Sequence, residues 1–531
     1  MTLPPYLSKV VSVACCYGPE PLRTCAFALS LLILAGCALP VLEQKTQHYV
    51  APDHVTTDTR LGRAWLSKRQ TNPDLSGIHP LADAHDAFTA RILLTGAAEQ
   101  TLDIQYYIWR ADITGTLLLE SLLSAADRGV RVRLLLDDNG IRGMDDALAA
   151  LAEQPNIHIR LFNPFVVRSP KWLGYITDFS RLNRRMHNKS FTADNQVTII
   201  GGRNIGDEYF GATDGLLFSD LDVLAAGAVV DEVSADFDKY WNSPFSYPAQ
   251  TLLPKASGSA KHMLHRLKQQ QNAARAQHYL EAIENSELTE QIVDGNLSLL
   301  WAPTRMISDP PGKIADKAQQ RAMLSHQLRN AIGEPKTALT LISPYFVPTA
   351  EGLDYFRNLA GQGIRVRILT NSLEATDVAA VHSGYAGYRK PLIKAGVELF
   401  EMRKLGSDSI EPHESKRPFG NSGSSLHAKT FIVDHRDVFI GSFNFDPRSI
   451  NLNTELGFVI ESEKLAGNME REISSLLPSS SYRVRLDSRD RLYWVEQNPD
   501  GKTIHTKEPY TSAGIRTLVF LMSLLPLEPL L

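Results

Sequence analysis

The sequence predicts an α/β protein in which two similar halves, each an α-β-α sandwich, face each other in a pseudo-twofold arrangement around one site. Three observations support this fold class. The order strand, helix, strand occurs twice along the 531 residues, and such alternation is typical of layered α/β folds. One short motif recurs in both halves with the same spacing. The composition, 43% hydrophobic and 21% charged, excludes a disordered chain and is sufficient for two cores.

The chain begins with a segment that we interpret as a lipoprotein signal peptide, residues 1–36. Its apolar run ends in Leu-Ala-Gly-Cys37, which resembles a bacterial lipobox, so that cleavage leaves Cys37 as a lipidated first residue. The alternative is an uncleaved anchor helix, although Pro40 interrupts the apolar run. Because Ala38 follows the cysteine, resemblance to bacterial sorting rules implies the outer membrane, facing the periplasm. Residues 37–59 then form a tether.

The cysteines and the net charge exclude several classes of function. All four cysteines lie at the N-terminus, at Cys15, Cys16, Cys25 and Cys37. The body of the chain therefore has no disulfide, thiolate metal site or cysteine nucleophile. With 55 Lys+Arg against 59 Asp+Glu, the net charge is −4, which argues against a generally basic protein that grips nucleic acid.

The two halves contain the repeated elements. In the first half, residues 60–245, strands are expected at 101–109, 130–138 and 157–162, and helices at 117–129 and 145–153. In the second half, residues 337–500, strands are expected at 338–347, 364–372 and 397–402, and helices at 352–363 and 378–394. The strands beginning Gly129-VRVRLLL and Gly363-IRVRIL are nearly identical, with basic and apolar residues alternating as in a strand with one buried face.

Two segments lie outside the repeat. Residues 246–336 contain Pro248, Pro254 and a Pro310-Pro311-Gly312 turn, and we interpret them as a connector with helices and no chemistry. The C-terminal segment, residues 501–531, ends in an apolar run from Leu518 that is too short to span a membrane. This run either packs on the body, which we favour, or dips into a bilayer.

The repeated motif lies within residues 181–208 and 421–448. The first copy contains His187, Lys189, Asp194, Gly202 and Asn204, and the second contains His427, Lys429, Asp434, Ser442 and Asn444. In both copies Lys follows His by two residues, Asp by seven and Asn by seventeen. Two copies in the same place of a repeat make accidental recurrence implausible.

The spacing of the motif indicates its chemistry. His and Lys two residues apart on a strand point to the same face, the Asp falls where the chain turns back, and the Gly and Asn end the next strand. Pairing the halves would gather two His, two Lys and two Asn in one pocket, where Lys neutralises phosphate oxygens and Asn and Ser442 donate to them. Taken singly, a strand His is more often structural and the Asp residues could be turn formers only. The repeat favours function for the His–Lys pairs.

The two motifs, His-x-Lys-x4-Asp followed by Gly-[Gly/Ser]-x-Asn, resemble the duplicated signature of the phospholipase D superfamily over roughly residues 60–500. The extended strings that begin at Arg184 and Ser425 look more narrowly like bacterial cardiolipin synthases, most of all their third, lipoprotein-like class (type C). The resemblance implies two phospholipase D-like domains with the active site at their interface, and neither a metal nor another cofactor. Gly202 departs from the Ser of many members, which removes one hydroxyl donor from the first half-site.

The resemblance also implies a mechanism of two steps through a phosphohistidine. By analogy His187 is the nucleophile, and His427 protonates the leaving alcohol and then deprotonates the incoming one. A negative neighbour would distinguish the two histidines. Glu455 and Asp222, which lie at similar positions downstream of the two motifs, are the candidate orienting carboxylates.

The acceptor separates the functions that the resemblance leaves open. Cardiolipin would be made from phosphatidylglycerol with phosphatidylglycerol or phosphatidylethanolamine. A water acceptor would instead make the protein a phospholipase D-type hydrolase that releases phosphatidic acid. A periplasmic nuclease is a further alternative, against which the acidic chain and the lipid anchor argue. The expected partners are phospholipids and a membrane surface, not nucleic acid.

A second segment suggests membrane contact. Residues 172–176 are apolar and aromatic, and they are flanked by Arg168, Lys171, Arg181, Arg184 and Arg185. Such a cluster suits a membrane interface with anionic headgroups. The alternative is an ordinary loop that packs under the domain.

Overall fold

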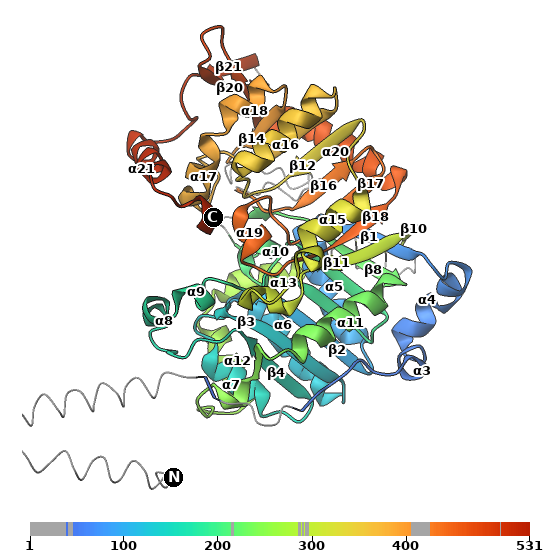
Figure 1. Ribbon diagram of the computed structural model, residues 1–531. Coiled ribbons are helices and arrows are strands. Elements are labelled where there is room, and N and C mark those ends of the chain that lie inside the picture. The colour runs from blue at the N-terminus through green and yellow to red at the C-terminus, as the bar shows by residue number, and fades with distance from the viewer. Residues whose placement is uncertain are drawn as a thin grey trace, which may run out of the picture.

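The computed structural model describes residues 39–40, 46–213, 217–284, 288, 291, 297–404, 425–499 and 501–531. The predicted signal peptide and Cys37 lie outside these residues. Two large mixed sheets dominate the structure, one in each half, and Figure 1 shows the blue-to-green half below the yellow-to-red half. This arrangement confirms the predicted α/β fold.

The first sheet has the strand order β10-β1-β8-β6-β5-β2-β3-β4-β9. In that order the strands span Leu300–Ala302, Ser76–Leu81, Asp222–Gly227, Val197–Gly201, Ser190–Ala193, Thr101–Ile108, Arg131–Gly140, Ile157–Phe162 and Ser246–Pro248. Strands β2, β3 and β4 are parallel, and the strands beside them are antiparallel. The parallel strands are the ones that the repeat predicts.

The second sheet has the order β11-β18-β17-β16-β12-β13-β14-β19-β20-β21. In that order the strands span Thr304–Ser308, Leu456–Glu461, Asp437–Gly441, Thr430–Val433, Ala338–Ile342, Arg365–Asn371, Glu398–Met402, Ser481–Leu486, Leu492–Asn498 and Gly501–His505. The run β18-β17-β16-β12-β13-β14 matches the run β8-β6-β5-β2-β3-β4 of the first sheet. Each motif hairpin therefore has the same place in its own sheet.

Helices cover both faces of each sheet because successive side chains of the central strands point to opposite faces, and the side chains on both faces are apolar. Leu134 and Leu136 of β3 face α5 (Ala84–Ala97), α6 (Ile113–Asp127) and α7 (Asp145–Ala152), whereas Leu135 faces α11 (Val229–Trp241). In the second half, α16 (Thr349–Gly361) and α18 (Arg389–Lys394) cover one face and α20 (Glu463–Ser480) the other. Each half is thus an α-β-α sandwich (Figure 1).

The two halves share a continuous apolar core. Ile200 and Val223 of the first sheet belong to the same buried cluster as Ile440, Leu456 and Phe458 of the second. Burial of apolar surface holds the halves together in the same way as a domain core does. The histidine loops at the ends of these strands are therefore positioned rigidly relative to each other.

The structure differs from the sequence prediction at the connector and the C-terminus. The region 246–336 contains helices α12 (Ala260–Gln269), α13 (Ala273–Glu284) and α15 (Leu324–Ile332), and it also supplies β9, β10 and β11 to the sheets. These strands are three to five residues long and lie on sheet edges, where length and periodicity give little signal. β21 extends the second sheet beyond residue 500. Of the helices in the described ranges, none is long and apolar enough to cross a membrane.

Candidate active site

Each motif forms a tight hairpin. β5 and β6 are joined through Asp194 and Asn195, and β16 and β17 through Asp434 and His435, all four with positive φ between 49° and 56°. Two successive residues with positive φ give the turn twist that matches flanking strands, and Asn and Asp tolerate this conformation. The predicted strand begins later than expected: His187 and Lys189 lie in an extended segment just before β5 starts at Ser190.

The two motif aspartates serve the turns. The Asp194 carboxylate accepts the backbone N–H groups of Glu99, Gln100 and Thr101 at 2.8–3.2 Å. Asp434 accepts the N–H groups of 336–338 in the same way, at 2.7–3.1 Å. Both carboxylates lie at the end of the hairpin that is remote from the histidines. This placement favours the turn-forming alternative over contact with substrate.

Each histidine is oriented by a carboxylate of the opposite half. Glu455 lies 2.8 and 3.0 Å from His187 Nδ1, and Asp220 lies 2.5 Å from His427 Nδ1. The backbone crosses over as well: His187 N donates to Thr454 O at 2.9 Å, and His427 N donates to the carbonyl of residue 219 at 2.7 Å. Because Nδ1 faces the carboxylate, Nε2 is the ring nitrogen left for a substrate.

The prediction for Asp222 is wrong, and Asp220 takes that place. Gly202 N bonds Leu221 O and Ser442 N bonds Leu456 O, so the residue that matches Glu455 is the one before Leu221. Asp222 is the first residue of β8 and instead forms an ion pair with Arg91 at 2.7 Å. The Asp-Leu and Glu-Leu dipeptides carried this register in the sequence. The different spacings made this match hard to recognise, because Asp220 follows Gly202 by 18 residues, whereas Glu455 follows Ser442 by 13.

The two lysines lie buried beside the histidines. Lys189 Nζ donates to His187 O at 2.5 Å, and Lys429 Nζ donates to His427 O. Burial lowers the pKa of Lys189 to about 7 against the opposing charge of Glu455, and the Lys429 ammonium lowers this pKa further. Burial likewise lowers the pKa of Lys429 to about 8, against Asp220 and Glu455. The structure thus places two lysines with lowered pKa values, one from each half, close enough to interact.

Burial also sets the charge of the histidines. It lowers the pKa of His187 to about 4, opposed by Glu455 and assisted by Lys189. The pKa of His427 is lowered by burial and by Lys429, against Asp220. Burial raises the pKa values of Glu455 and Asp220, but the interactions with the facing histidine, including its Nδ1 hydrogen bond, and with the lysine charge outweigh burial, so both pKa values lie below their usual range. Neutral imidazoles beside ionised carboxylates are therefore the resting state at neutral pH.

The phosphate-binding residues are not equivalent. Asn204 is engaged by the protein: its Oδ1 accepts from Ile108 N at 3.2 Å and its Nδ2 donates to Tyr209 Oη at 2.9 Å. The buried Oδ1 of Asn444 has no hydrogen-bond partner within the described part of the chain. The amide of Asn444 is therefore the one still available to a ligand, after rotation if a donor is needed.

The absence of a hydroxyl at Gly202 has a steric reason. A Cβ at this position would lie 2.1 Å from Asp220 Oδ1. In the second half, Ser442 Oγ instead donates to Glu455 Oε2 at 2.5 Å. The shorter aspartate occupies the space of the missing side chain, so the two half-sites hold their carboxylates differently.

One cavity joins the two half-sites. It has a volume of about 750 Å³, and both histidines and both asparagines line it. Further lining residues that the motifs did not indicate are Tyr107, Arg110, Tyr209, Tyr345, Asp377 and Arg448. The Tyr107 ring meets His187 edge-on at 5.0 Å, and the Tyr209 ring meets His427 at 5.2 Å. Within the described ranges, no cluster of three His, Cys, Asp or Glu side chains is placed to hold a metal ion.

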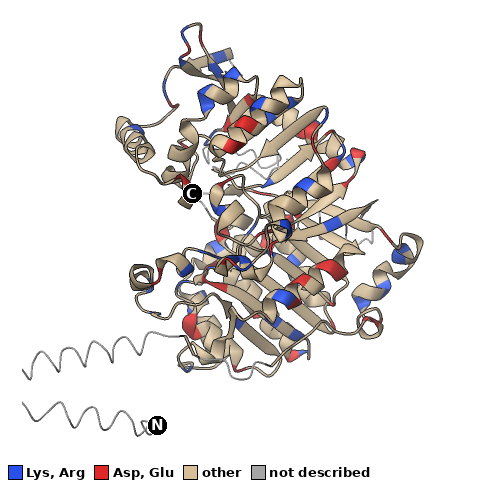
Figure 2. Cartoon of the chain, viewed as in Figure 1, with Lys and Arg blue, Asp and Glu red and all other residues tan. Residues whose placement is uncertain are grey.

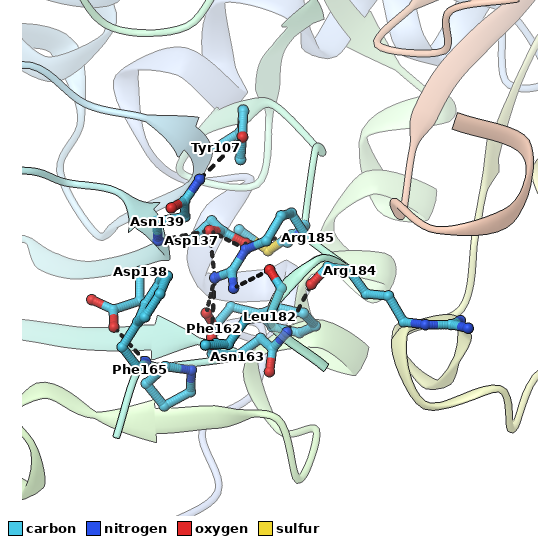
Figure 3. A network of polar contacts seen from close by, with 12 residues as sticks. Tyr107, Asp137, Asp138, Asn139, Phe162, Asn163, Phe165, Leu182, Arg184 and Arg185 are labelled. Carbon is cyan, nitrogen blue, oxygen red and sulfur yellow. Dashed lines mark hydrogen bonds and ion pairs between the residues drawn. The ribbon is translucent and has the colours of Figure 1, made fainter. Parts of the chain in front are cut away.

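A buried polar network fixes the segment that leads to His187. Arg185 pairs with Asp137 of β3 at 2.7 Å and donates to Asn163 O at 3.0 Å, while Met186 N donates to Asp137 Oδ2 at 2.9 Å (Figure 3). Arg185 is almost fully buried. It therefore holds the loop in place and is not free for a lipid headgroup.

Comparison with known proteins agrees with this geometry. The family model "Cardiolipin synthase, PLD-like domain" matches residues 93–241 and 328–477, more than half of the chain. Cardiolipin synthase C of Escherichia coli K12 is 48% identical over 472 residues, which are 89% of this chain and 100% of that protein. An uncharacterised protein of Helicobacter pylori strain 26695 is 30% identical over 88% of this chain and 92% of its own length.

The fold is also found in a solved structure. The crystal structure of phosphatidylserine synthase from Haemophilus influenzae Rd KW20 superposes with a TM-score of 0.54 at 13% identity, and it covers 89% of this chain and 100% of that one. At this identity the likeness concerns the fold alone. The family match and the 48% identity to cardiolipin synthase C show that the chain belongs to the cardiolipin synthase family of phospholipase D-like phosphatidyltransferases.

Proposed function

We propose that the protein transfers phosphatidyl groups between phospholipids and makes cardiolipin. The observation that carries this proposal is the shared cavity, into which each half contributes one histidine held by a carboxylate of the other half. The relatedness to cardiolipin synthase C over the whole length of that enzyme supports the choice of phospholipid as substrate. The donor is phosphatidylglycerol or phosphatidylethanolamine, and the acceptor is the glycerol hydroxyl of phosphatidylglycerol.

The first chemical step forms a phosphohistidine. Neutral His187 attacks phosphorus through Nε2, the bond from phosphorus to the headgroup oxygen breaks, and His427 gives its proton to the leaving alcohol. The phosphodiester charge raises the pKa of His427 on binding, so that His427 takes up from solvent the proton that it then donates. Lys189 and Lys429 stabilise the charge that develops on the phosphoryl oxygens.

The second step reverses the first with a new alcohol. His427 removes the proton from the acceptor hydroxyl, the oxygen attacks phosphorus, and the bond from phosphorus to His187 breaks. Glu455 stabilises the positive charge that His187 carries in the intermediate, and Asp220 does the same for protonated His427. If water takes the place of the acceptor, the product is phosphatidic acid, which is the hydrolase alternative.

The lipobox-like sequence that ends at Cys37 supports a proposed location for the protein. We propose that Cys37 is lipidated and holds the chain on the periplasmic side of the outer membrane, where phospholipid substrates are at hand. Replacing Cys37 by Ala should leave the signal peptide uncleaved. A change in mobility on denaturing gels and loss of labelling by a radioactive fatty acid would report this.

Analysis of lipid products tests the proposed function. The purified protein, incubated with phosphatidylglycerol vesicles with and without phosphatidylethanolamine, should form cardiolipin, and the His187→Asn and His427→Asn variants should not. Phosphatidic acid as the sole product would identify a hydrolase. Cleavage of DNA, with no change in lipids, would identify a nuclease and contradict the proposal.

A further inference from the structure

Two apolar segments far apart in the sequence project from one side of the molecule. Helices α8 (Trp172–Thr177) and α9 (Phe179–Leu182) expose Trp172, Ile176 and Phe179, of which Ile176 is 71% exposed. Helix α21 (Ala513–Ser523) and the residues after it expose Leu518, Phe520, Leu521, Leu524 and Leu525. In Figure 1 these helices stand out on the left, on either side of the C-terminal segment.

Both segments are connected to the wall of the catalytic cavity. Arg448, which lines the cavity, donates through Nη1 to Asn183 O at 2.9 Å, directly after α9. The same guanidinium donates through Nε to Leu530 O at 3.2 Å, and Leu530 and Leu531 line the cavity as well. One residue of the cavity wall therefore connects the end of α9 with the segment that follows α21.

Helix α21 is attached by only part of its surface. Val519 is the one buried residue of this helix, and it packs toward α17 (Ala379–Ala386). A cavity of about 620 Å³ lies between other parts of α21 and α17. Arg516 is its only charged residue, and Figure 2 shows the helix almost entirely tan. The expectation that the C-terminal run packs on the body holds for one face only, and the other face is apolar and uncovered.

The cations around α8 are not free to bind anionic headgroups. Arg168 pairs with Asp138 and Asp145, and Lys171 also pairs with Asp138. Arg181 pairs with Asp178 and Arg184 with Asp316. The structure thus changes the interpretation of this segment: its contribution to an interface is apolar contact, and charge contributes little.

We propose that α8, α9 and the exposed face of α21 form a docking surface for the phospholipid bilayer, with the catalytic cavity opening between them. The inference rests on the proposed function, since a phospholipid keeps its acyl chains in the bilayer while its phosphorus must reach His187 and His427, which are less than 10% exposed. The cavity mouth must therefore lie at the bilayer surface. Aromatic and aliphatic side chains around that mouth are the groups that insert at such a surface.

Single substitutions that place a charge on this surface test the proposal in the full-length protein. Ile176→Asp and Leu521→Asp should each lower turnover of phosphatidylglycerol vesicles by about tenfold or more, because each removes the insertion of one large apolar side chain. Turnover of monomeric short-chain phosphatidylglycerol should stay within about twofold of wild type. Ile504→Asp is the matched control, since Ile504 is 64% exposed on β21, away from the cavity.

The two substrates separate the possible failures. If wild type turns over neither substrate, the proposed function fails. If wild type is active and the two variants keep full activity on vesicles, or lose activity equally on both substrates, the docking surface is wrong. A second copy of the chain is the other occupant for such a face: a wild-type dimer that Leu521→Asp converts to a monomer, without loss of activity on vesicles, would overturn the proposal.

Fluorescence gives a readout that does not depend on activity. Vesicles of phosphatidylcholine with brominated acyl chains should quench the Trp fluorescence of wild type more than that of Trp172→Phe, because Trp172 enters the bilayer. Quenching should persist in about 0.5 M salt, a condition at which exposed charge attraction is screened. Equal quenching of the two proteins would place Trp172 outside the bilayer.

Discussion

At the scale of single residues, two aspartates two positions apart have different tasks. Asp220 is buried against His427 Nδ1, whereas Asp222 is buried against Arg91 and lies 3.6 Å from Arg203. The first carboxylate orients a group that contacts substrate, and the second neutralises arginines inside the first half. Replacing Asp220 by its amide should therefore mainly lower activity, and replacing Asp222 by its amide should mainly lower stability.

Asp220→Asn should lower kcat by about 10²–10⁴-fold, because the amide no longer stabilises protonated His427. The melting temperature of Asp220→Asn should fall less below that of wild type than the melting temperature of Asp222→Asn does. Asp222→Asn leaves Arg91 with an unpaired buried charge, which typically costs about 3–5 kcal/mol. Steady-state kinetics with thermal unfolding checks both. A greater catalytic loss in the folded Asp222→Asn variant than in Asp220→Asn would refute the assignment.

Gly202→Ser should reduce activity although Ser442 is the matching residue of the second half. The new Cβ would lie 2.1 Å from Asp220 Oδ1, so the carboxylate must move away from His427. We expect a loss of about tenfold or more in kcat, with little change in KM, since a displaced orienting group affects the chemical step. The double variant Gly202→Ser/Asp220→Ala should lose no more activity than Asp220→Ala alone. Additive losses would show that the two changes act independently.

At the scale of elements, the sequence predicted the motif hairpins but not the short strands at the sheet edges. The aspartates mark the turns, and the alternation of apolar residues marks the strands, both of which are local signals. The short edge strands β9, β10 and β11 have no comparable signal. Their pairing depends on partners far away along the chain, which a local pattern does not contain.

Asp434→Asn tests the structural role of the turn aspartates. Burial raises the pKa of Asp434, but the N–H groups of residues 336–338 lower it by more, so its net shift is downward. The charged carboxylate therefore stabilises the fold above its unfolded pKa of about 4, and this contribution is lost as the pH falls through the lower folded pKa. At pH 7 the variant should be less stable by about 1 kcal/mol, a value limited by solvent screening of this partly exposed group. The difference from wild type should vanish in acid. An equal difference at pH 3 and pH 7, measured by urea unfolding, would contradict this role.

At the scale of the whole molecule, the duplication predicts a shared site but not which residues of one half contact those of the other. The repeat indicated that the His–Lys pairs meet, and the cavity contains both histidines. The sequence indicated Glu455 as an orienting carboxylate, but not that each carboxylate contacts the histidine of the opposite half. This exchange depends on how residues 186 and 454, and the strands β15 (Ser425–Leu426) and β7 (Phe218–Ser219), pair between the halves. That pairing is a property of the assembled molecule.

The charge state of the site also belongs to the assembled molecule. Burial lowers the pKa of Lys189 to about 7 and of Lys429 to about 8, and the Lys429 ammonium acts on Lys189 across the interface. The value of kcat/KM should fall as the pH rises through 7 to 8, because the cations that bind the phosphodiester lose their protons. A rate profile on short-chain phosphatidylglycerol checks this. A profile that is level from pH 7 to pH 10 would exclude a need for charged lysines.

Trapping the covalent intermediate shows whether both halves act on one phosphodiester with His187 as nucleophile. A donor labelled at phosphorus is mixed with the His427→Asn variant, the reaction is quenched at high pH, and the labelled peptide is sequenced. We expect label on His187 in this variant and no label in His187→Asn. Label on His427 in the His187→Asn variant, or on a residue outside the shared cavity, would contradict it.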